Sequence, residues 1–175
     1  MRSHSMDLIW SPLPENLARL EERILSSLKS WEGTKYRSGQ RLRGVDADCI
    51  GFSCGQIDIM DGRQRAVSPM LPSDAALHDP AGARDAVATI RRLYDPAELV
   101  LPNEDGQILV QPMDILIAES GAGGPGHMML VGPEKNTLWH CTQMTGVTKT
   151  GWSLFTGYER VFAVYRLLDR EDWIS

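Results

Sequence analysis

The order of the periodic segments constrains the fold of this chain more than any other feature of its sequence. In the first half, apolar residues recur every three or four positions, which is typical of helices. From about Leu99 onward, short apolar or alternating runs are separated by turn residues, which is typical of strands. Helices followed by strands favour an α+β fold with an antiparallel sheet over a doubly wound parallel sheet. No internal repeat or domain linker interrupts this order.

The segment boundaries follow from capping and turn residues. Helices are expected over 12–31, about 47–60 and about 80–94, with Ser11 and Asp46 as N-caps and Asp79-Pro80 opening the third. Strands are expected over 107–110, 114–118, 127–132, 137–142, 146–150 and 160–167. Residues 120–126 read as a flexible loop, and residues 63–79 as a connection. Gly51 and Gly55 weaken the second helix, so we expect a neighbouring backbone to approach it closely.

Length, charge and hydropathy exclude several classes of protein. The chain has 175 residues, of which 1–5 look like an expression remnant, so we expect a single domain over 6–175. The net charge is −5 without a Lys/Arg cluster, which argues against a nucleic-acid partner. No apolar run approaches the length of a membrane span, and no signal peptide is visible, so synthesis in the cytoplasm is expected.

The three cysteines are too few for a disulfide framework, and we expect them to stay reduced. Cys49, Cys54 and Cys141 could in principle join His127 and His140 in a zinc site. However, the Cys-x4-Cys spacing lies outside the tight loops of structural zinc sites. We therefore expect no metal and no cofactor, and a zinc-binding fold remains an alternative.

Cys49 is the candidate nucleophile because it falls in the first turn of the second expected helix. A helix N-terminus carries unpaired N–H groups and roughly half a positive charge. A thiolate is stabilised there, and the thiolate is the reactive form of cysteine. A half-buried structural cysteine is the alternative interpretation, so the chemistry depends on a partner base.

His127 and His140 are the candidate bases, because each lies on an expected strand and a short turn joins the two strands. A turn centred between Glu134 and Lys135 would pair residues whose numbers sum to about 269. His127 and His140 would then be diagonal neighbours within side-chain reach. A cysteine nucleophile needs a base and an orienting group, so Cys49, His127 and His140 form a candidate catalytic set.

The segment 33–52 resembles the nucleophile segment of the NlpC-type cell-wall cysteine peptidases, a family similar to papain in its core fold. The family pattern of a tyrosine followed by Gly-x-Asp-Cys-Ser-Gly-Phe is matched by Tyr36, Gly44, Asp48, Cys49, Gly51 and Phe52. Ile50, Gln40 and Met113 depart from the family pattern. Segments 112–116, 127–132 and 138–140 resemble the strand before the histidine, the base strand and the strand of the third polar residue. One branch of the family, found in phage tails and gene-transfer agents, tends to have an apolar residue after the cysteine and an aromatic-rich last strand. Ile50 and the segment 161–165 resemble these two features.

The resemblance, which runs from about Leu17 to Tyr165, implies a papain-like fold. Its N-terminal helices would pack on an antiparallel sheet of about five to six strands. Cys49 would be the nucleophile, His127 the general base and His140 its orienting group. Tyr36 would help to hold the oxyanion. Asp48 is, like Tyr36, a candidate residue for binding the oxyanion or the substrate. It would stabilise the start of the helix rather than take part in the reaction.

The function implied by this resemblance is hydrolysis of amide bonds in peptidoglycan stem peptides, such as that between D-glutamate and a diamino acid. Partners would be the peptidoglycan peptide and proteins of a phage tail or tail-like particle, which could carry the enzyme to the cell wall. Two alternatives stay open. One is a cysteine amidase or acyltransferase acting on another amide, and the other is an inactive structural member of a tail-like assembly.

Overall fold

The computed structural model describes residues 7–119, 125–152 and 161–174. The suspected expression remnant at 1–5 and most of the expected loop at 120–126 lie outside the described residues, whereas Gly126 belongs to a strand.

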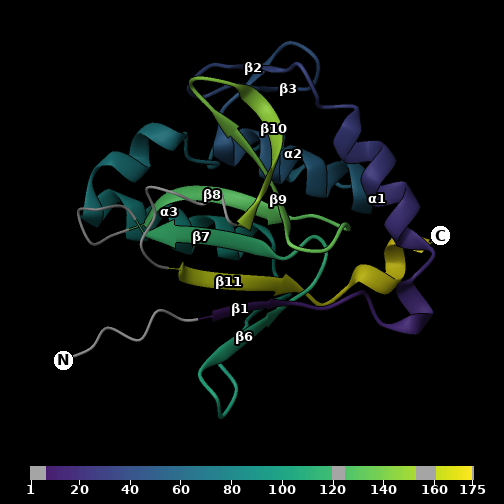
Figure 1. Cartoon of the computed structure of the whole chain (residues 1–175). Helices are drawn as coiled ribbons and strands as arrows, with labels where there is room; N and C mark the ends of the chain where they lie inside the picture. Colours follow the sequence, from purple (N-terminus) through teal and green to yellow (C-terminus); the bar gives the residue numbers. More distant parts are fainter. Residues whose placement is uncertain (1–6, 120–124, 153–160, 175) are drawn as a thin grey trace.

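The described residues form a mixed α+β structure in which three α-helices precede most of the sheet (Figure 1). The helices are α1 (Leu20–Lys29), α2 (Cys49–Asp61) and α3 (Pro80–Leu93). The main sheet has the strand order β10-β9-β8-β7-β11-β5, and each of its neighbouring pairs is antiparallel. Its strands are β5 (Ala97–Leu99), β7 (Ile115–Glu119), β8 (Pro125–Val131), β9 (Thr137–Thr142), β10 (Gly146–Gly151) and β11 (Val161–Leu167). The predicted α+β class with an antiparallel sheet is therefore confirmed.

Two small sheets and several short helices were not predicted. β1 (Asp7–Trp10) pairs in parallel with β6 (Gln107–Val110), so β6 stands outside the main sheet. A second small sheet has three strands, β2 (Lys35–Tyr36), β3 (Arg41–Leu42) and β4 (Asp46–Ala47), and it precedes α2. Short 3-10 helices are η1 (Glu15–Leu17), η2 (Arg65–Val67), η3 (Asp74–His78) and η5 (Arg170–Ile174).

The first helix begins later than the sequence predicts. Pro14 has an extended backbone and precedes η1, so α1 starts only at Leu20. A proline disfavours the helical conformation in the residue before it, which explains why the segment around Pro12 and Pro14 stays outside the helix. The apolar periodicity expected of this helix is nevertheless confirmed, because Leu20, Ile24 and Leu28, which are spaced four residues apart, are all buried.

The second helix begins at Cys49, and its N-cap is Asp48 rather than the predicted Asp46. Asp46 is paired in β4 instead. The expected close approach of a backbone is confirmed at Gly51, where a Cβ would collide with the carbonyl oxygen of Gln40. The N-terminal turn of α2 is thus pressed against the small sheet that precedes it.

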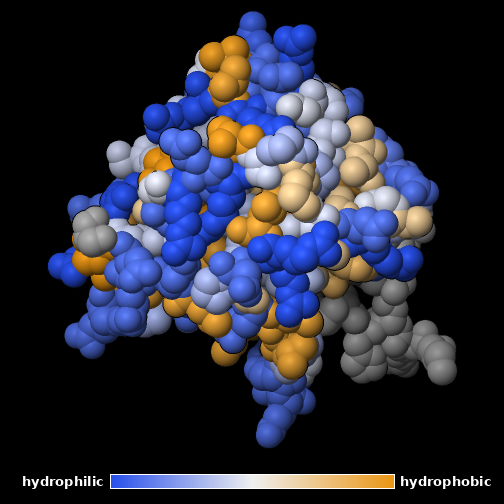
Figure 2. Space-filling view, turned by 180° about the vertical axis from the view of Figure 1, so that it is seen from behind, coloured by the Kyte–Doolittle hydropathy of each residue, from blue (hydrophilic) through white to orange (hydrophobic). Residues whose placement is uncertain are grey.

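Two hydrophobic clusters divide the interior between the faces of the main sheet. The helices pack on one face, where the larger cluster includes Ile117 and Met128 of the sheet. β1 and β6 cover part of the other face, where Met129 is buried in the smaller cluster. Viewed from behind the face of Figure 1, the surface is a mixture of hydrophilic and small apolar areas (Figure 2). Within the described ranges, no helix is both long and apolar enough to cross a membrane.

Candidate active site

Cys49 lies at the point where the start of α2 meets strands β8 and β9. Its side chain is only 3% exposed, and the backbone N–H of Met128 in β8 donates to the sulfur. On the β9 side, the Cys141 thiol donates to the carbonyl oxygen of Ala47, at 3.1 Å. The start of the helix is therefore fixed against both strands that carry the candidate histidines.

His127 and His140 are in direct contact. The register of β8 and β9 pairs Leu130 with Trp139 and Val131 with Leu138, which confirms the predicted pairing. Nε2 of His127 lies 3.0 Å from Nδ1 of His140, at hydrogen-bonding distance, and the two rings meet nearly edge to face. The short turn of the hairpin thus brings together two histidines that are 13 residues apart.

Cys49 meets the strand that carries His127 at the neighbouring residue rather than at the imidazole. The sulfur is held at Met128, the residue that follows His127 in β8. Among the hydrogen bonds between described residues, none joins the Cys49 sulfur to the His127 ring. The structure therefore places the thiol beside the strand that carries the base, without a formed thiol–imidazole hydrogen bond.

Burial determines the charge states of Cys49, His127 and His140. It raises the pKa of the Cys49 thiol, the Met128 N–H opposes that rise, and the carboxylates of Asp48 and Asp74 add to it. Burial also lowers the pKa of His127 to about 3, an effect that His140 strengthens and Asp74 weakens, and it lowers the pKa of His140. The thiolate stabilisation expected from the helix N-terminus is therefore outweighed, and the thiol and both imidazoles are neutral near pH 7.

Asp48 organises the start of α2. It is 1% exposed, and burial raises its pKa. One carboxylate oxygen accepts the N–H of Gly51, and the other accepts the N–H groups of Gly39 and Asp74. The carboxylate thus connects three segments around Cys49, and its oxygens are directed at backbone rather than at a substrate space.

Tyr36 lies on β2, which is paired with the strand that leads into Cys49. Its hydroxyl donates a hydrogen bond to Oδ2 of Asp74. Partial burial and the Asp74 carboxylate raise the pKa of Tyr36, so the phenol stays protonated. The hydroxyl is directed at this carboxylate, and the structure does not place it on the sulfur.

Asp74 is the residue of this site that the sequence did not reveal. It begins η3 in the segment expected to be a connection, and it is buried. Its carboxylate accepts hydrogen bonds from Tyr36 and from the hydroxyl of Ser38, and its charge acts on both Cys49 and His127. No spacing in the sequence relates Asp74 to Cys49, because their proximity depends on the folding of η3 against the start of α2.

The described residues contain no cluster of three or more His, Cys, Asp or Glu side chains that could hold a metal ion. Cys54, the third cysteine considered for zinc, is fully buried within α2, and its carbonyl oxygen accepts the hydroxyl of Tyr94.

Comparisons with known proteins bear on the fold. No family model matches the sequence, and no curated protein matches it either. Among solved structures, the chain is similar to a Staphylococcus aureus protein described as similar to a lipoprotein of the NLP/P60 family. The TM-score is 0.52 and the sequence identity is 16%.

The match covers 95% of this chain and 45% of the staphylococcal protein, so the chain spans less than half the length of that protein. At this identity the likeness concerns the fold. It agrees with the family resemblance of the sequence, and it does not distinguish a phage-related branch.

Proposed function

We propose that this protein is a thiol hydrolase with a papain-like core that cleaves amide bonds in cell-wall peptides. Cys49 would be the nucleophile, His127 the general base, and His140 the residue that orients it. The hydrogen-bonded His127–His140 pair, at the end of the sheet where α2 begins with a cysteine, is the observation that carries this proposal. The structural similarity to an NLP/P60 protein supports it at the level of the fold.

The geometry of the histidine pair supports one proposal for where the protons lie. Nε2 of His127 faces Nδ1 of His140, so Nδ1 of His127 would be the atom that accepts the thiol proton. His127 would then carry its own proton on Nε2 and donate it to Nδ1 of His140. This tautomer is the one in which His140 can stabilise the imidazolium that forms on His127.

The reaction would begin from a neutral pair, because burial favours the neutral forms of both groups. The thiol proton would move to His127 as the sulfur attacks the amide carbonyl. The resulting imidazolium would protonate the leaving amine, and water activated by His127 would then release the acyl group from Cys49. The backbone N–H of Cys49 would hold the oxyanion. Tyr36 could join it after its hydroxyl turns away from Asp74.

The substrate belongs to the same proposal and rests on the sequence resemblance. Stem peptides of peptidoglycan, with the bond between D-glutamate and a diamino acid as the first candidate, are the substrates we propose. Delivery to the cell wall by a phage-tail-like particle is the location that would suit such a substrate, and Ile50 together with the aromatic segment 161–165 supports it.

The decisive experiment is mass analysis of fragments released from purified peptidoglycan. Wild type should release peptides with a defined new terminus, and Cys49→Ala should release none. Cys54→Ala is the matched control, because Cys54 is a buried cysteine of the same helix outside the histidine contact. Circular dichroism verifies that both variants are folded. Fragment release by Cys49→Ala, or no release by folded wild type, would overturn the proposal.

A further inference from the structure

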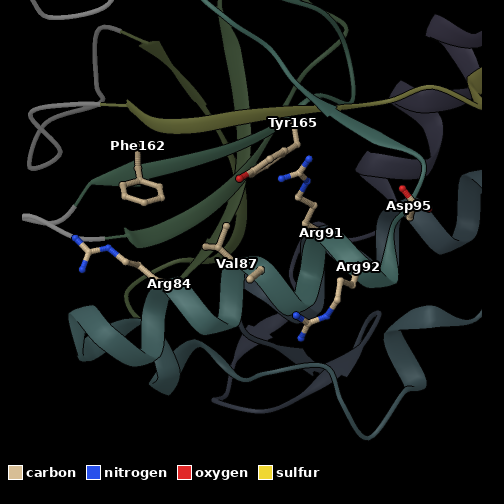
Figure 3. Close-up of a pocket in the computed structure, with 8 residues that line it drawn as sticks. Arg84, Val87, Arg91, Arg92, Asp95, Phe162 and Tyr165 are labelled. Carbon is tan, nitrogen blue, oxygen red and sulfur yellow. The ribbon is translucent and has the colours of Figure 1, made fainter.

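A groove between α3 and β11 lies outside the candidate active site (Figure 3). Its cavity measures about 500 Å³. Val87 lies on the α3 side, and the rings of Phe162 and Tyr165 project from β11 across from it. The groove therefore has an apolar and aromatic middle section between a helix and the sheet.

Two arginines flank this middle section. Arg84 and Arg91 are seven residues apart on α3, which separates them by about 10 Å along the helix axis. The Arg91 guanidinium lies 5.9 Å from the centre of the Tyr165 ring. Neither arginine forms an ion pair with any residue that the structure describes. Among the described residues, both guanidinium groups therefore lack a directly paired carboxylate, in a protein whose net charge is −5.

The groove starts near the candidate active site. Phe162 follows Val161, which pairs with Ala118, and Ala118 pairs with His127. Two strand spacings separate β11 from β8, so the backbone beside Phe162, at this end of the groove, lies about 10 Å from the backbone of His127. Toward its other end, Figure 3 places Asp95, beyond Arg91 and Tyr165. The groove thus leads away from the histidine pair along α3.

We propose that this groove binds the carboxylate-bearing part of a peptide substrate, distal to the bond that Cys49 attacks. This inference rests on the proposed function. Guanidinium groups recognise carboxylates through paired hydrogen bonds. In a polyproline II chain, which has three residues per turn and rises about 3.1 Å per residue, side chains three residues apart lie on one face. Carboxylates on such a chain are about 9 Å apart, which matches the spacing of Arg84 and Arg91 along α3. The apolar stretch between them lies against Val87 and Phe162.

Binding to a defined probe tests the groove without turnover. The probe is a fluorescein-labelled hexapeptide with two glutamates three residues apart, and its partner carries glutamines instead. Binding to the full chain with Cys49→Ala is followed by fluorescence anisotropy in about 0.15 M salt, where distant charges are largely screened. We expect the glutamate peptide to bind at least about tenfold more tightly than the glutamine peptide. Arg84→Gln and Arg91→Gln should each weaken it about three- to fivefold, and together about tenfold or more.

Arg92→Gln is the matched control on the same helix. Arg92 also lines the groove, but its side chain points away from β11 in Figure 3 and donates to the hydroxyl of Thr89. We expect this variant to stay within about twofold of the parent, because the charge is removed outside the arginine pair. Equal binding of the two peptides overturns the proposal. So does an equal effect of all three substitutions, or no effect from Arg84→Gln and Arg91→Gln.

Hydrolysis by the active protein separates failure of the groove from failure of the proposed function. The double variant R84Q/R91Q should raise KM for a carboxylate-rich wall peptide about tenfold, with kcat close to wild type. If hydrolysis depends on Cys49 but KM is unchanged in R84Q/R91Q, the proposed role of the groove is refuted and the proposed enzymatic function stands. Selective, arginine-dependent binding of the glutamate peptide, together with a folded wild-type protein that hydrolyses no wall peptide, refutes the proposed function and with it the assignment of that peptide as substrate.

Discussion

Removing the carboxylate of Asp48 perturbs the candidate active site through a defined set of hydrogen bonds. Its oxygens accept backbone N–H groups from Gly51 at 2.6 Å, Gly39 at 2.8 Å and Asp74 at 3.0 Å. These bonds connect the first turn of α2, the small three-stranded sheet and η3. Asp48→Ala breaks all three bonds at once, and it leaves Cys49 on a helix without its cap.

The magnitude follows from these contacts. Loss of an N-cap costs about 0.5–2 kcal/mol. Each further N–H left without an acceptor in the interior costs about 1–3 kcal/mol. Removing the charge also relieves the desolvation that raises the pKa of Asp48, which offsets part of the loss. We therefore expect the free energy of unfolding to fall by about 2–5 kcal/mol, which for a domain of this size lowers Tm by about 5–15 °C.

Urea unfolding and thermal melts of Asp48→Ala and Asp46→Ala measure this difference. Asp46 is the matched control because the sequence nominates it as the cap. Its carboxylate instead pairs with the mostly exposed Arg37 at 3.5 Å. Loss of that pair should change the free energy of unfolding by less than about 1 kcal/mol. If Asp46→Ala lowers the free energy of unfolding as much as Asp48→Ala or more, the assignment of Asp48 as the N-cap is refuted.

Two further predictions concern the pH dependence of stability and the packing of α2. The folded pKa of His127 is about 3, below its ordinary value near 6.5, so between these values the unfolded chain binds more protons. The free energy of unfolding should therefore fall as pH falls, by on the order of 2–3 kcal/mol between pH 7 and 4.5. In urea unfolding, the free energy of unfolding of His127→Gln should depend less steeply on pH than that of wild type. An equal slope would contradict the assignment of this pH dependence to His127. Gly51→Ala should lower Tm, because the new Cβ meets the Gln40 carbonyl oxygen. In an open helix the same change would stabilise by about 1 kcal/mol, so a rise in Tm would disprove the contact.

Features set by neighbours in the chain were predictable. Apolar periodicity located all three helices, and alternation with turn residues located β6 to β11 to within about two residues. The turn between β8 and β9 fixed their register, because a short hairpin leaves few ways to pair its strands. The contact between His127 and His140 follows from that register and was predicted from the sequence.

Features set by competition between distant segments were not predictable in the same way. Asp46 and Asp48 are both suitable caps by residue type. β4 forms only because Lys35 and Leu42 are brought alongside Asp46, which leaves Asp48 to cap the helix. The parallel pairing of β1 with β6 joins segments about 100 residues apart, and no local pattern encodes such a pairing.

The sequence by itself determined which residues could carry thiol chemistry, since a cysteine beside a helix start and two histidines on one hairpin are local patterns. Only the tertiary structure decided the environment of those residues. It buried Cys49 and His127, which favours their neutral forms and reverses the expected stabilisation of the thiolate. It also brought Asp74 next to them from a segment without a recognisable pattern. The physical reason is that desolvation and the fields of neighbouring charges depend on packing across the whole chain.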